Sequence, residues 1–207
     1  YSFLFGAAEK CKASAVATAH HANDQAETVL LHVLRGSGID GLCGMRPYSL
    51  PNAFSETFPL IRPLLGITRP EIESYIQEHE IPYREDCSNS DPAYTRNRIR
   101  LDLIPKLAAD YNPQIINGLC RLAETAAADK EILDEDCADI LKYGAYRLTE
   151  NGAEWDIRSY YSQPIGLRLR LLRKILTDLK ADLSDIGYQN LKDSDIFFMT
   201  ARDNQTM

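Results

Sequence analysis

The sequence predicts an α/β fold in three parts: part of a parallel-sheet domain at residues 1–107, a connecting helix at about 108–144, and a small, mostly helical domain at 145–207. Two observations indicate this. An apolar segment ends in polar residues and passes directly into an amphipathic helical pattern, which is the order of a parallel strand and its crossover helix. Beyond residue 112, apolar residues recur at helical spacing with one interruption by a hairpin signal.

In the first part we expect a helix end at 3–12, a buried strand at 12–19, a helix at 22–34, a glycine-rich loop at 36–44, an irregular segment to 56 and a short strand at 58–62. The 22–34 helix should bury Val29, Leu30 and Val33. The strand at 58–62 is closed by a proline, which cannot donate a backbone hydrogen bond.

A capping box predicts the next helix. Thr68 is followed three residues later by Glu71, and Pro70 suits the first turn. This helix should run to about His79 and bury Ile72, Tyr75 and Ile76. A polar loop should follow at 82–92, and then a helix at 94–107 with an apolar face of Ile99, Leu103, Ile104 and Leu107.

The connecting helix should begin after Asn112-Pro113 and end at about Tyr143, because Gly144 is a favourable stop. Its apolar stripe is Ile116, Leu119, Leu122, Ala123, Ala126, Leu133, Cys137, Ile140 and Leu141.

The last part should contain a hairpin and two helices. Asn151-Gly152 favours a turn between strands at 146–148 and 154–157. A basic helix should run from 162–164 to about Leu179, and Ser184-Asp185 should cap the final helix.

Composition narrows the class of protein. A net charge of −7 over 207 residues argues against a broadly basic nucleic-acid binder. No apolar run approaches the length of a membrane span, and the N-terminus lacks a signal-peptide pattern, so we expect a cytoplasmic protein. The five cysteines are scattered without a CxxC pair, which favours reduced thiols over disulfides or a metal centre.

The residues after the first strand are the main candidates for chemistry. His20, His21, Asp24 and Gln25 follow the strand directly, and ligands of open α/β sheets bind outside the carboxyl ends of strands. If the helix begins near residue 22, His20 precedes it and Asp24 falls in its first turn. An alternative is that Asp24 only caps the helix, since acidic residues are favoured there. Glu27 suits structural hydrogen bonds as well as a metal ion.

Two blocks of sequence resemble a known family. Residues 17–45 contain HHxxDQAET and RGSGxxGLxGM, and residues 61–107 contain RPLL, EDxSNxD and YxRNxIRxxxxPxL. They resemble the adenylating synthetases of the PP-loop ATP-pyrophosphatase superfamily, and among these the tRNA(Ile)-lysidine synthetases. The resemblance implies that residues 1–107 are the C-terminal part of a PP-loop, adenine nucleotide hydrolase-like domain.

The resemblance also implies a ligase reaction. ATP, with Mg²⁺, adenylates the C2 oxygen of the wobble cytidine in tRNA(Ile) with a CAU anticodon. The ε-amine of free L-lysine then attacks C2 and expels AMP, which leaves lysidine. A homodimer is a candidate assembly, and no membrane partner is expected.

Carried onto this chain, the resemblance and the charge pattern give three groups of candidate residues. The catalytic candidates are His20, Asp24 and Arg96. The candidates for binding ATP are Arg35, Gly36, Gly38 and Arg100, and no protein-held metal is expected. The candidates for binding tRNA or lysine are His21, Gln25, Asn97, Arg98, Arg168, Arg170, Arg173 and Lys174. Arg96 and Arg100 lie one helical turn apart, so both should point from one face. Basic side chains opposite an apolar stripe are more often simply solvated, so the Arg168–Lys174 cluster is the weaker signal.

The chain departs from the family pattern at two points. Asn23 replaces the usual first aspartate of an Asp-Asp-Gln triplet, and the Ser-Gly-Gly-x-Asp-Ser phosphate loop is absent. The sequence therefore reads as a fragment, and we expect residues 1–207 alone neither to bind ATP tightly nor to release pyrophosphate. Two alternatives stay open: an inactive tRNA-binding fragment, or another PP-loop enzyme such as a tRNA thiolase or a small-molecule amide synthetase. The iron–sulfur thiolases use CxxC pairs, which this chain lacks.

Overall fold

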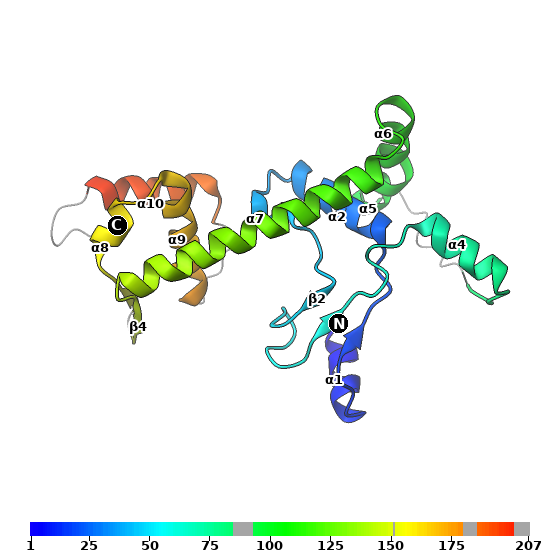
Figure 1. Cartoon of the computed structure of the whole chain (residues 1–207), viewed down its shortest axis with the longest axis horizontal. Helices are drawn as coiled ribbons and strands as arrows, with labels where there is room; N and C mark the ends of the chain where they lie inside the picture. The colour runs from blue at the N-terminus through cyan, green and yellow to red at the C-terminus, as the bar shows by residue number, and fades with distance from the viewer. Residues whose placement is uncertain (85–92, 151, 180–185, 201–207) are drawn as a thin grey trace. The chain divides into compact units, whose positions relative to one another are not determined.

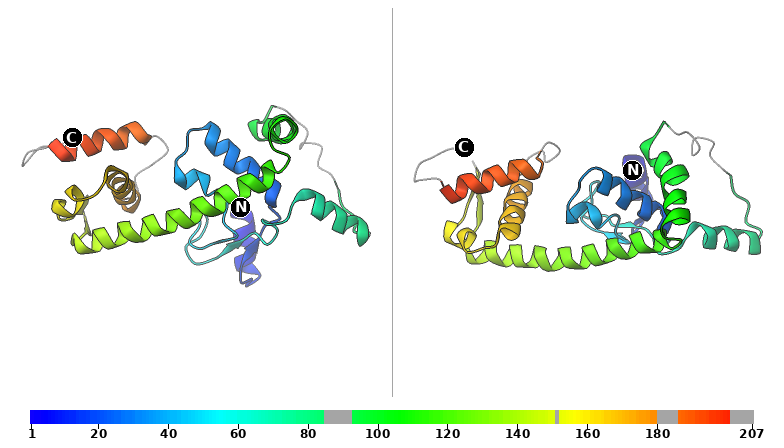
Figure 2. Two further views of the ribbon diagram at one scale, coloured as in Figure 1. Left: turned by 45° about the horizontal axis from the view of Figure 1, so that its top comes forward. Right: turned by 90° about the horizontal axis from the view of Figure 1, so that it is seen from above.

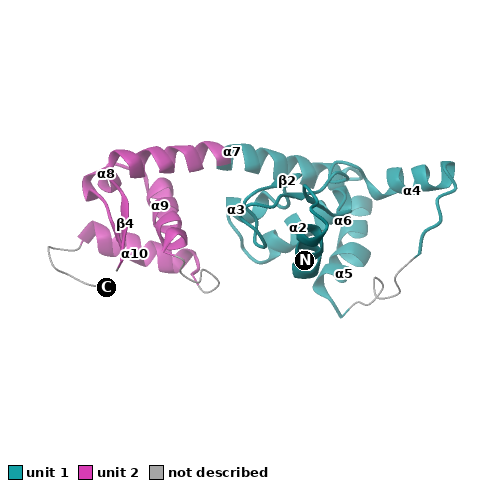
Figure 3. Ribbon diagram, turned by 90° about the horizontal axis from the view of Figure 1, so that it is seen from below, with its two compact units in different colours: residues 1–130 teal, residues 131–207 magenta. Residues whose placement is uncertain are grey.

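The structure, a computed structural model, describes residues 1–84, 93–150, 152–179 and 186–200. The chain forms two compact units, Tyr1–Lys130 and Glu131–Met207 (Figure 3). Helix α7 (Ile115–Tyr143) contributes its first half to unit 1 and its second half to unit 2 (Figure 1). Within the described ranges, no helix is long and apolar enough to cross a membrane.

Unit 1 contains a small mixed sheet in the order β1-β3-β2. Strands β1 (Val16–Ala17) and β3 (Leu60–Ile61) pair in parallel, with Val16 opposite Leu60, as the sequence predicts, although both are shorter than expected. Strand β2 (Tyr48–Ser49) pairs antiparallel with β3 and falls in the segment predicted to be irregular. Its two residues are too few to show the alternation that identifies a strand.

Helix α2 (Ala22–Leu34) has the predicted bounds, but its buried face differs from the predicted one. Val29 is fully buried, whereas Val33 is 48% exposed, so the prediction for Val33 was wrong. The inner face is made of Ala22, Ala26 and Val29, which lie at helical spacing and allow close packing. Ala26 and Val29 pack with Ile99, Ile104, Leu119 and Ala123. Both views in Figure 2 show α2 beside the first half of α7.

Two further helices flank α2 in the chain. Helix α1 (Ser2–Lys10) precedes β1, and the glycine-rich loop contains a short helix, α3 (Ile39–Leu42), that was not predicted. Helix α4 (Arg69–Glu78) has the predicted capping box of Thr68 and Glu71. None of its residues is buried, and Tyr75 is 57% exposed with its ring against His79, so the prediction that Tyr75 is buried was wrong.

The predicted helix at 94–107 is helical throughout but not uniform. It consists of α5 (Thr95–Arg98), a π-helical turn η2 (Ile99–Leu103) and α6 (Ile104–Asp110). The Ile104 N–H reaches the Ile99 carbonyl in the wide turn, and Pro105 next to it has no N–H to continue the α pattern. Ile99 and Ile104 are buried as predicted.

Unit 2 contains the second half of α7, the hairpin β4 (Arg147–Thr149) and β5 (Gly152–Glu154), and helices α8 (Ile157–Tyr161), α9 (Ile165–Asp178) and α10 (Tyr188–Thr200). The hairpin is confirmed, but Thr149 pairs with Gly152, so Gly152 lies in a strand and not in the turn. The strand predicted to reach 157 ends at Glu154, because Asp156 caps α8 through the Arg158 N–H. The proposed cap at Ser184-Asp185 lies outside the described residues.

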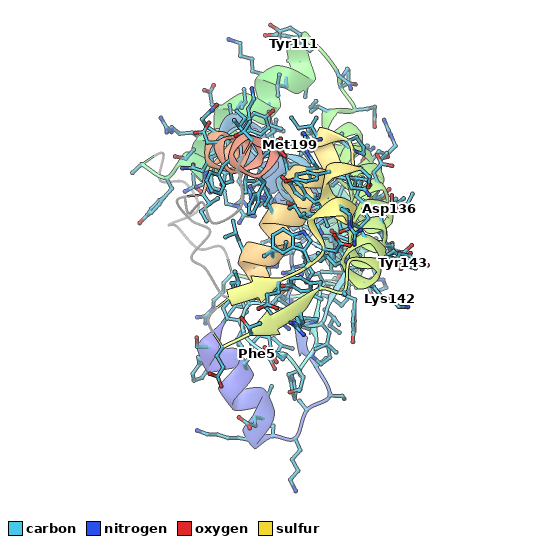
Figure 4. The ribbon with its side chains drawn as sticks, turned by 90° about the vertical axis from the view of Figure 1, so that its left-hand side faces the viewer. Phe5, Tyr111, Asp136, Lys142, Tyr143 and Met199 are labelled. Carbon is cyan, nitrogen blue, oxygen red and sulfur yellow. The ribbon has the colours of Figure 1, made fainter. Side chains whose placement is uncertain are left out.

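The α7 stripe is largely confirmed on both units. Leu119, Ala123, Ala126, Cys137 and Leu141 are buried, whereas Leu122 is exposed, contrary to prediction. The helix ends at Tyr143, and a Cβ on Gly144 would overlap the Ser159 side chain, which explains the glycine. On the opposite face Asp136, Lys142 and Tyr143 are exposed to solvent (Figure 4).

Candidate active site at the start of helix α2

The site begins where β1 leads into α2. Ala22 is the first helical residue, so His20 precedes the helix and Asp24 lies in its first turn, as predicted. The backbone N–H of His21 donates to Asp24 Oδ2 at 3.1 Å, and His21 Nε2 lies 3.4 Å from the same oxygen. Asp24 therefore does cap the helix. The capping role uses Oδ2, one of the two carboxylate oxygens of Asp24.

The other oxygen of Asp24 belongs to a cluster of four charges. Arg96 NH2 lies 3.2 Å and Arg100 NH2 lies 3.0 Å from Asp24 Oδ1. The two Nε atoms reach separate oxygens of Glu27, at 2.8 Å for Arg96 and 2.6 Å for Arg100. Both arginines thus point from one face of their helix, as predicted, even though Arg96 lies in α5 and Arg100 in the π turn.

This cluster fastens the arginine-bearing helix to α2. The Glu27 side chain is 1% exposed, and two guanidinium groups compensate its charge and satisfy both oxygens. The hydrogen bond to Glu27 is also the main cause of the raised pKa of Arg100. Glu27 makes structural hydrogen bonds, which was one of the two roles that its sequence position suggested. Only its spacing of three residues from Asp24 signalled that it would join the cluster.

The surroundings of His20 favour its neutral form. Burial is the largest cause of its lowered pKa, and the nearby cations Arg62 and Arg96 act in the same direction, whereas Asp24 opposes them. Its Nδ1 lies 2.9 Å from the Thr18 hydroxyl. A neutral imidazole held in this way has its second nitrogen available to a ligand.

Gln25 anchors the glycine-rich loop. Its Nε2 donates to the Met45 carbonyl at 2.9 Å, and its Oε1 accepts from the Met45 N–H at 2.8 Å. Gly44 has a φ of +55°, and a Cβ there would overlap the Gln25 amide, so two constraints require glycine. The predicted contact of Gln25 with substrate stays a prediction, and its observed role is to hold this loop.

The ATP-binding candidates lie at the other end of α2. Arg35 is the C-cap and is exposed, Gly36 has a φ of +73°, and Gly38 precedes α3. The fourth candidate, Arg100, lies instead in the charge cluster at the start of α2.

Asn23 has a role that the sequence did not reveal. Its Oδ1 accepts the backbone N–H of Arg69, the first residue of α4, at 2.9 Å. An aspartate offers the same acceptor atom, so the exchange of aspartate for asparagine preserves this contact. Because Arg69 lies 46 residues away, no local pattern could have identified it.

Two candidates for tRNA contact, Asn97 and Arg98, lie between the two arginines of the charge cluster in the sequence. Arg98 is exposed and its NH2 contacts the Thr95 hydroxyl at 3.3 Å, whereas Asn97 is half-buried. The motif residues Asp86, Asn89 and Asp91 lie outside the described residues.

The basic face of α9 in unit 2 is largely paired with carboxylates. Arg168 binds Asp195 through both Nε and NH2, at 2.7 and 2.9 Å, beside the buried Tyr160. Arg170 binds Asp134, and Lys174 binds Asp178. Any binding of tRNA by these side chains must compete with those pairs, and it stays a prediction.

Comparison with known proteins shows which family the domain that contains this site belongs to. The sequence model of the PP-loop domain matches residues 1–107, which contain all four members of the charge cluster. The chain belongs to the PP-loop domain family. The PP-loop domain match ends before α7, so it includes His20 and the glycine-rich loop but not the basic face of α9.

Curated relatives of this PP-loop domain protein extend the similarity across both units. It is 37% identical over 191 residues to the tRNA(Ile)-lysidine synthase of Geobacter sulfurreducens, with 92% of this chain and 39% of the relative covered. It is 37% identical over 179 residues to that of Nostoc, covering 85% and 49%. It is 29% identical over 205 residues to that of Clostridioides difficile, covering 99% and 42%. The chain thus spans between two fifths and half of the length of these relatives.

Proposed function

We propose that this protein takes part in tRNA modification as a tRNA(Ile)-lysidine synthase, joining lysine to C2 of the wobble cytidine after adenylation by ATP. The observation that carries the proposal is the placement of His20 and Asp24 at the carboxyl end of β1, in a domain of the PP-loop family. The similarity to the three synthases supports the choice of substrate.

Asp24 has the chemistry to orient the attacking amine. Oδ1 already accepts from both arginines, whereas Oδ2 accepts the backbone N–H of His21 and lies 3.4 Å from His21 Nε2, so an ammonium donor would share this oxygen with the imidazole. In this proposal Asp24 holds the lysine ε-ammonium, and the neutral His20 hydrogen-bonds the cytosine or receives the proton that the amine releases.

ATP is proposed to bind with its phosphates toward Arg35 and the glycines that follow it. Nothing lies within 4 Å of a Cβ placed on Gly36 or Gly38, so a ligand can approach this backbone closely. At the α2 start, a phosphate that reaches Arg96 or Arg100 must compete with Asp24 and Glu27, which already pair with both guanidinium groups.

Within the described ranges, no three histidine, cysteine, aspartate or glutamate side chains converge, and the arginines engage the oxygens of Glu27. In this proposal Mg²⁺ accompanies ATP as a phosphate-bound ion, and Asn97, Arg98 and Arg173 remain the candidates for tRNA contact.

The direct test compares residues 1–207 with a longer form that carries the family's phosphate loop, each incubated with ATP, Mg²⁺, labelled lysine and tRNA(Ile) with a CAU anticodon. The proposal predicts that the longer form incorporates lysine into tRNA with release of AMP and pyrophosphate, and that residues 1–207 alone release little pyrophosphate. A tRNA whose wobble cytidine is replaced by uridine is the matched control and should incorporate none. Consumption of ATP without lysine incorporation would favour another PP-loop reaction, and tRNA binding without ATP consumption would favour a binding module.

A further inference from the structure

The segment that bears His20 is held at both ends by backbone hydrogen bonds. The Thr18 N–H donates to the Ile61 carbonyl at 3.0 Å, one residue beyond the end of β1. The Ala22 N–H donates to the Ile67 carbonyl at 2.8 Å, at the first residue of α2. His20 lies midway between these two anchors, so its backbone has little freedom, and the direction of its ring depends on the side chains around it.

Thr18 also holds the imidazole of His20. Its hydroxyl oxygen lies 2.9 Å from His20 Nδ1, and both side chains are half-buried. Within the described ranges, the Thr18 hydroxyl has no other hydrogen-bond partner. If Nδ1–H donated to the hydroxyl oxygen, the hydroxyl hydrogen would have no acceptor in those ranges. If the hydroxyl donates to Nδ1, that hydrogen is used, so the second arrangement is favoured.

The environment of His20 gives this hydrogen bond a consequence for the other ring nitrogen. Burial is the largest cause of the lowered pKa of His20. Among the charged groups that face it, the carboxylate of Asp24 raises the pKa, whereas the cations Arg62 and Arg96 and the neighbouring His21 lower it. A neutral imidazole has one ring N–H, and the hydrogen bond made by one nitrogen decides whether the other carries the hydrogen.

We propose that Thr18 is a positioning residue whose hydroxyl donates to His20 Nδ1 and thereby presents Nε2–H as a fixed donor to the pyrimidine of the substrate. A donor suits cytosine, whose C2 oxygen and N3 are both acceptors, whereas uracil carries a hydrogen on N3. In this tautomer Nε2 has no lone pair for a proton, so His20 binds the base and does not take the proton of the amine. The choice of a pyrimidine rests on the proposed function, and the tautomer itself does not.

The ring nitrogens of His20 report the tautomer directly and without substrate. In ¹⁵N spectra of residues 1–207 labelled at histidine, a ring nitrogen that bears hydrogen is well separated from one that does not. We expect the hydrogen of His20 on Nε2 and not on Nδ1, with the signals assigned through His20→Gln. His32 is the opposite reference, because its Nδ1 lies 2.5 Å from the Gly41 carbonyl, which can only accept.

Two variants separate the hydroxyl of Thr18 from the space that it fills. Thr18→Val removes the hydroxyl, so both ring signals of His20 should move toward values averaged over the two tautomers. Thr18→Ser retains a hydroxyl and should retain the wild-type signals. Thr28→Val is the matched control, because the Thr28 hydroxyl donates to the Asp24 carbonyl within α2, and its loss should leave the signals of His20 unchanged.

The same variants test the positioning role in catalysis. In a longer form that carries the family's phosphate loop, Thr18→Val should lower the rate of lysine incorporation about fivefold, which is the effect of losing one neutral hydrogen bond. Thr18→Ser should remain near the wild-type rate. A Thr18→Val protein that loses the tautomer and keeps the full rate would overturn the positioning role.

The wild-type spectrum decides the tautomer even if Thr18→Val does not fold. Hydrogen on His20 Nδ1 in the wild type overturns the proposal, as does a Thr18→Val spectrum identical to that of the wild type. The expected tautomer in a longer form that incorporates no lysine supports the assignment of Thr18 and rejects the proposed function. Lysine incorporation by a protein with the opposite tautomer does the reverse.

Discussion

At the scale of single residues, Glu27 is the side chain that holds the two arginines of the candidate site in place. It is a buried carboxylate in the core of α2, and such a charge is tolerated only when it is paired and hydrogen-bonded. Here two arginines from a helix about 70 residues away supply the partners, as the separations of 69 and 73 residues show. The same pairs hold Arg96 and Arg100 beside Asp24, so a stabilising contact also fixes the geometry of the candidate site.

The first prediction concerns this buried charge. Glu27→Gln should destabilise unit 1 by about 3 kcal/mol, because it removes one of the two carboxylates that compensate the arginine pair and leaves Asp24 alone to do so. Glu73→Gln is the matched control, since Glu73 forms an exposed pair with Arg69 and should cost less than about 1 kcal/mol. Denaturant unfolding of both variants measures the difference, and equal losses would contradict the role assigned to Glu27.

The second prediction concerns pH and His20. Burial lowers the pKa of His20 below its ordinary value of 6.5, so the unfolded chain binds the proton more readily than the folded one. Stability should therefore fall as pH decreases through 6.5 toward the lower folded-state pKa, and this contribution should be fully present above 6.5. Melting temperatures between pH 7.5 and 5.5 should fall more steeply for the wild type than for His20→Gln. Parallel slopes would show that His20 is not the group responsible.

At the scale of elements, the sequence predicted the features that depend on residues close together in the chain. The bounds of α2 and the capping box of α4 were predictable because their signals lie within a few residues of each other. The exposure of Val33, Leu122 and Tyr75 was not, because burial depends on which face meets a partner. Likewise, the sequence grouped His20, Asp24 and Arg96. It assigned Arg100 to the group of Arg35, and it revealed neither the pairing through Glu27 nor the contact of Asn23 with α4.

The third prediction concerns the docking of α4. Asn23→Ala should remove the acceptor for the Arg69 N–H and weaken the start of α4 by about 1 kcal/mol, as loss of a helix cap does. Asn23→Asp retains the oxygen and should preserve the contact. Amide hydrogen exchange at Arg69 measures this directly: faster exchange is expected in the alanine variant only. Unchanged exchange in both would show that the side chain does not hold α4.

The fourth prediction separates structure from tRNA binding on α9. Arg168→Ala should destabilise unit 2, because it leaves the buried Asp195 without its bidentate partner. Arg173→Ala breaks no carboxylate pair in the described part of α9 and should leave stability nearly unchanged. Loss of tRNA affinity in Arg173→Ala at unchanged melting temperature would support a tRNA-binding face. If Arg168→Ala melts like the wild type, its structural role is refuted.

At the scale of the whole molecule, the two units have separate cores joined through one continuous helix. Ala26, Val29, Ile99 and Leu119 belong to the core of unit 1, and Tyr160, Leu171 and Leu191 to that of unit 2. The PP-loop match and the candidate chemistry lie in unit 1. The similarity to the synthases also covers most of unit 2, whose proposed contribution is tRNA contact.

The central claim is that the start of α2 performs chemistry on tRNA, and Asp24→Asn tests it most directly. The assay uses a longer form of the protein that carries the family's phosphate loop, and it measures lysine incorporation into tRNA(Ile) with a CAU anticodon, alongside tRNA affinity and melting temperature. We predict a loss of rate of about 10²–10⁴ with tRNA affinity retained, because a positioned group that handles a proton or ammonium typically contributes this much. Asn23→Asp, the neighbouring substitution, should keep its rate. Near-normal turnover by the folded Asp24→Asn protein would contradict the account and leave Asp24 as a helix cap alone.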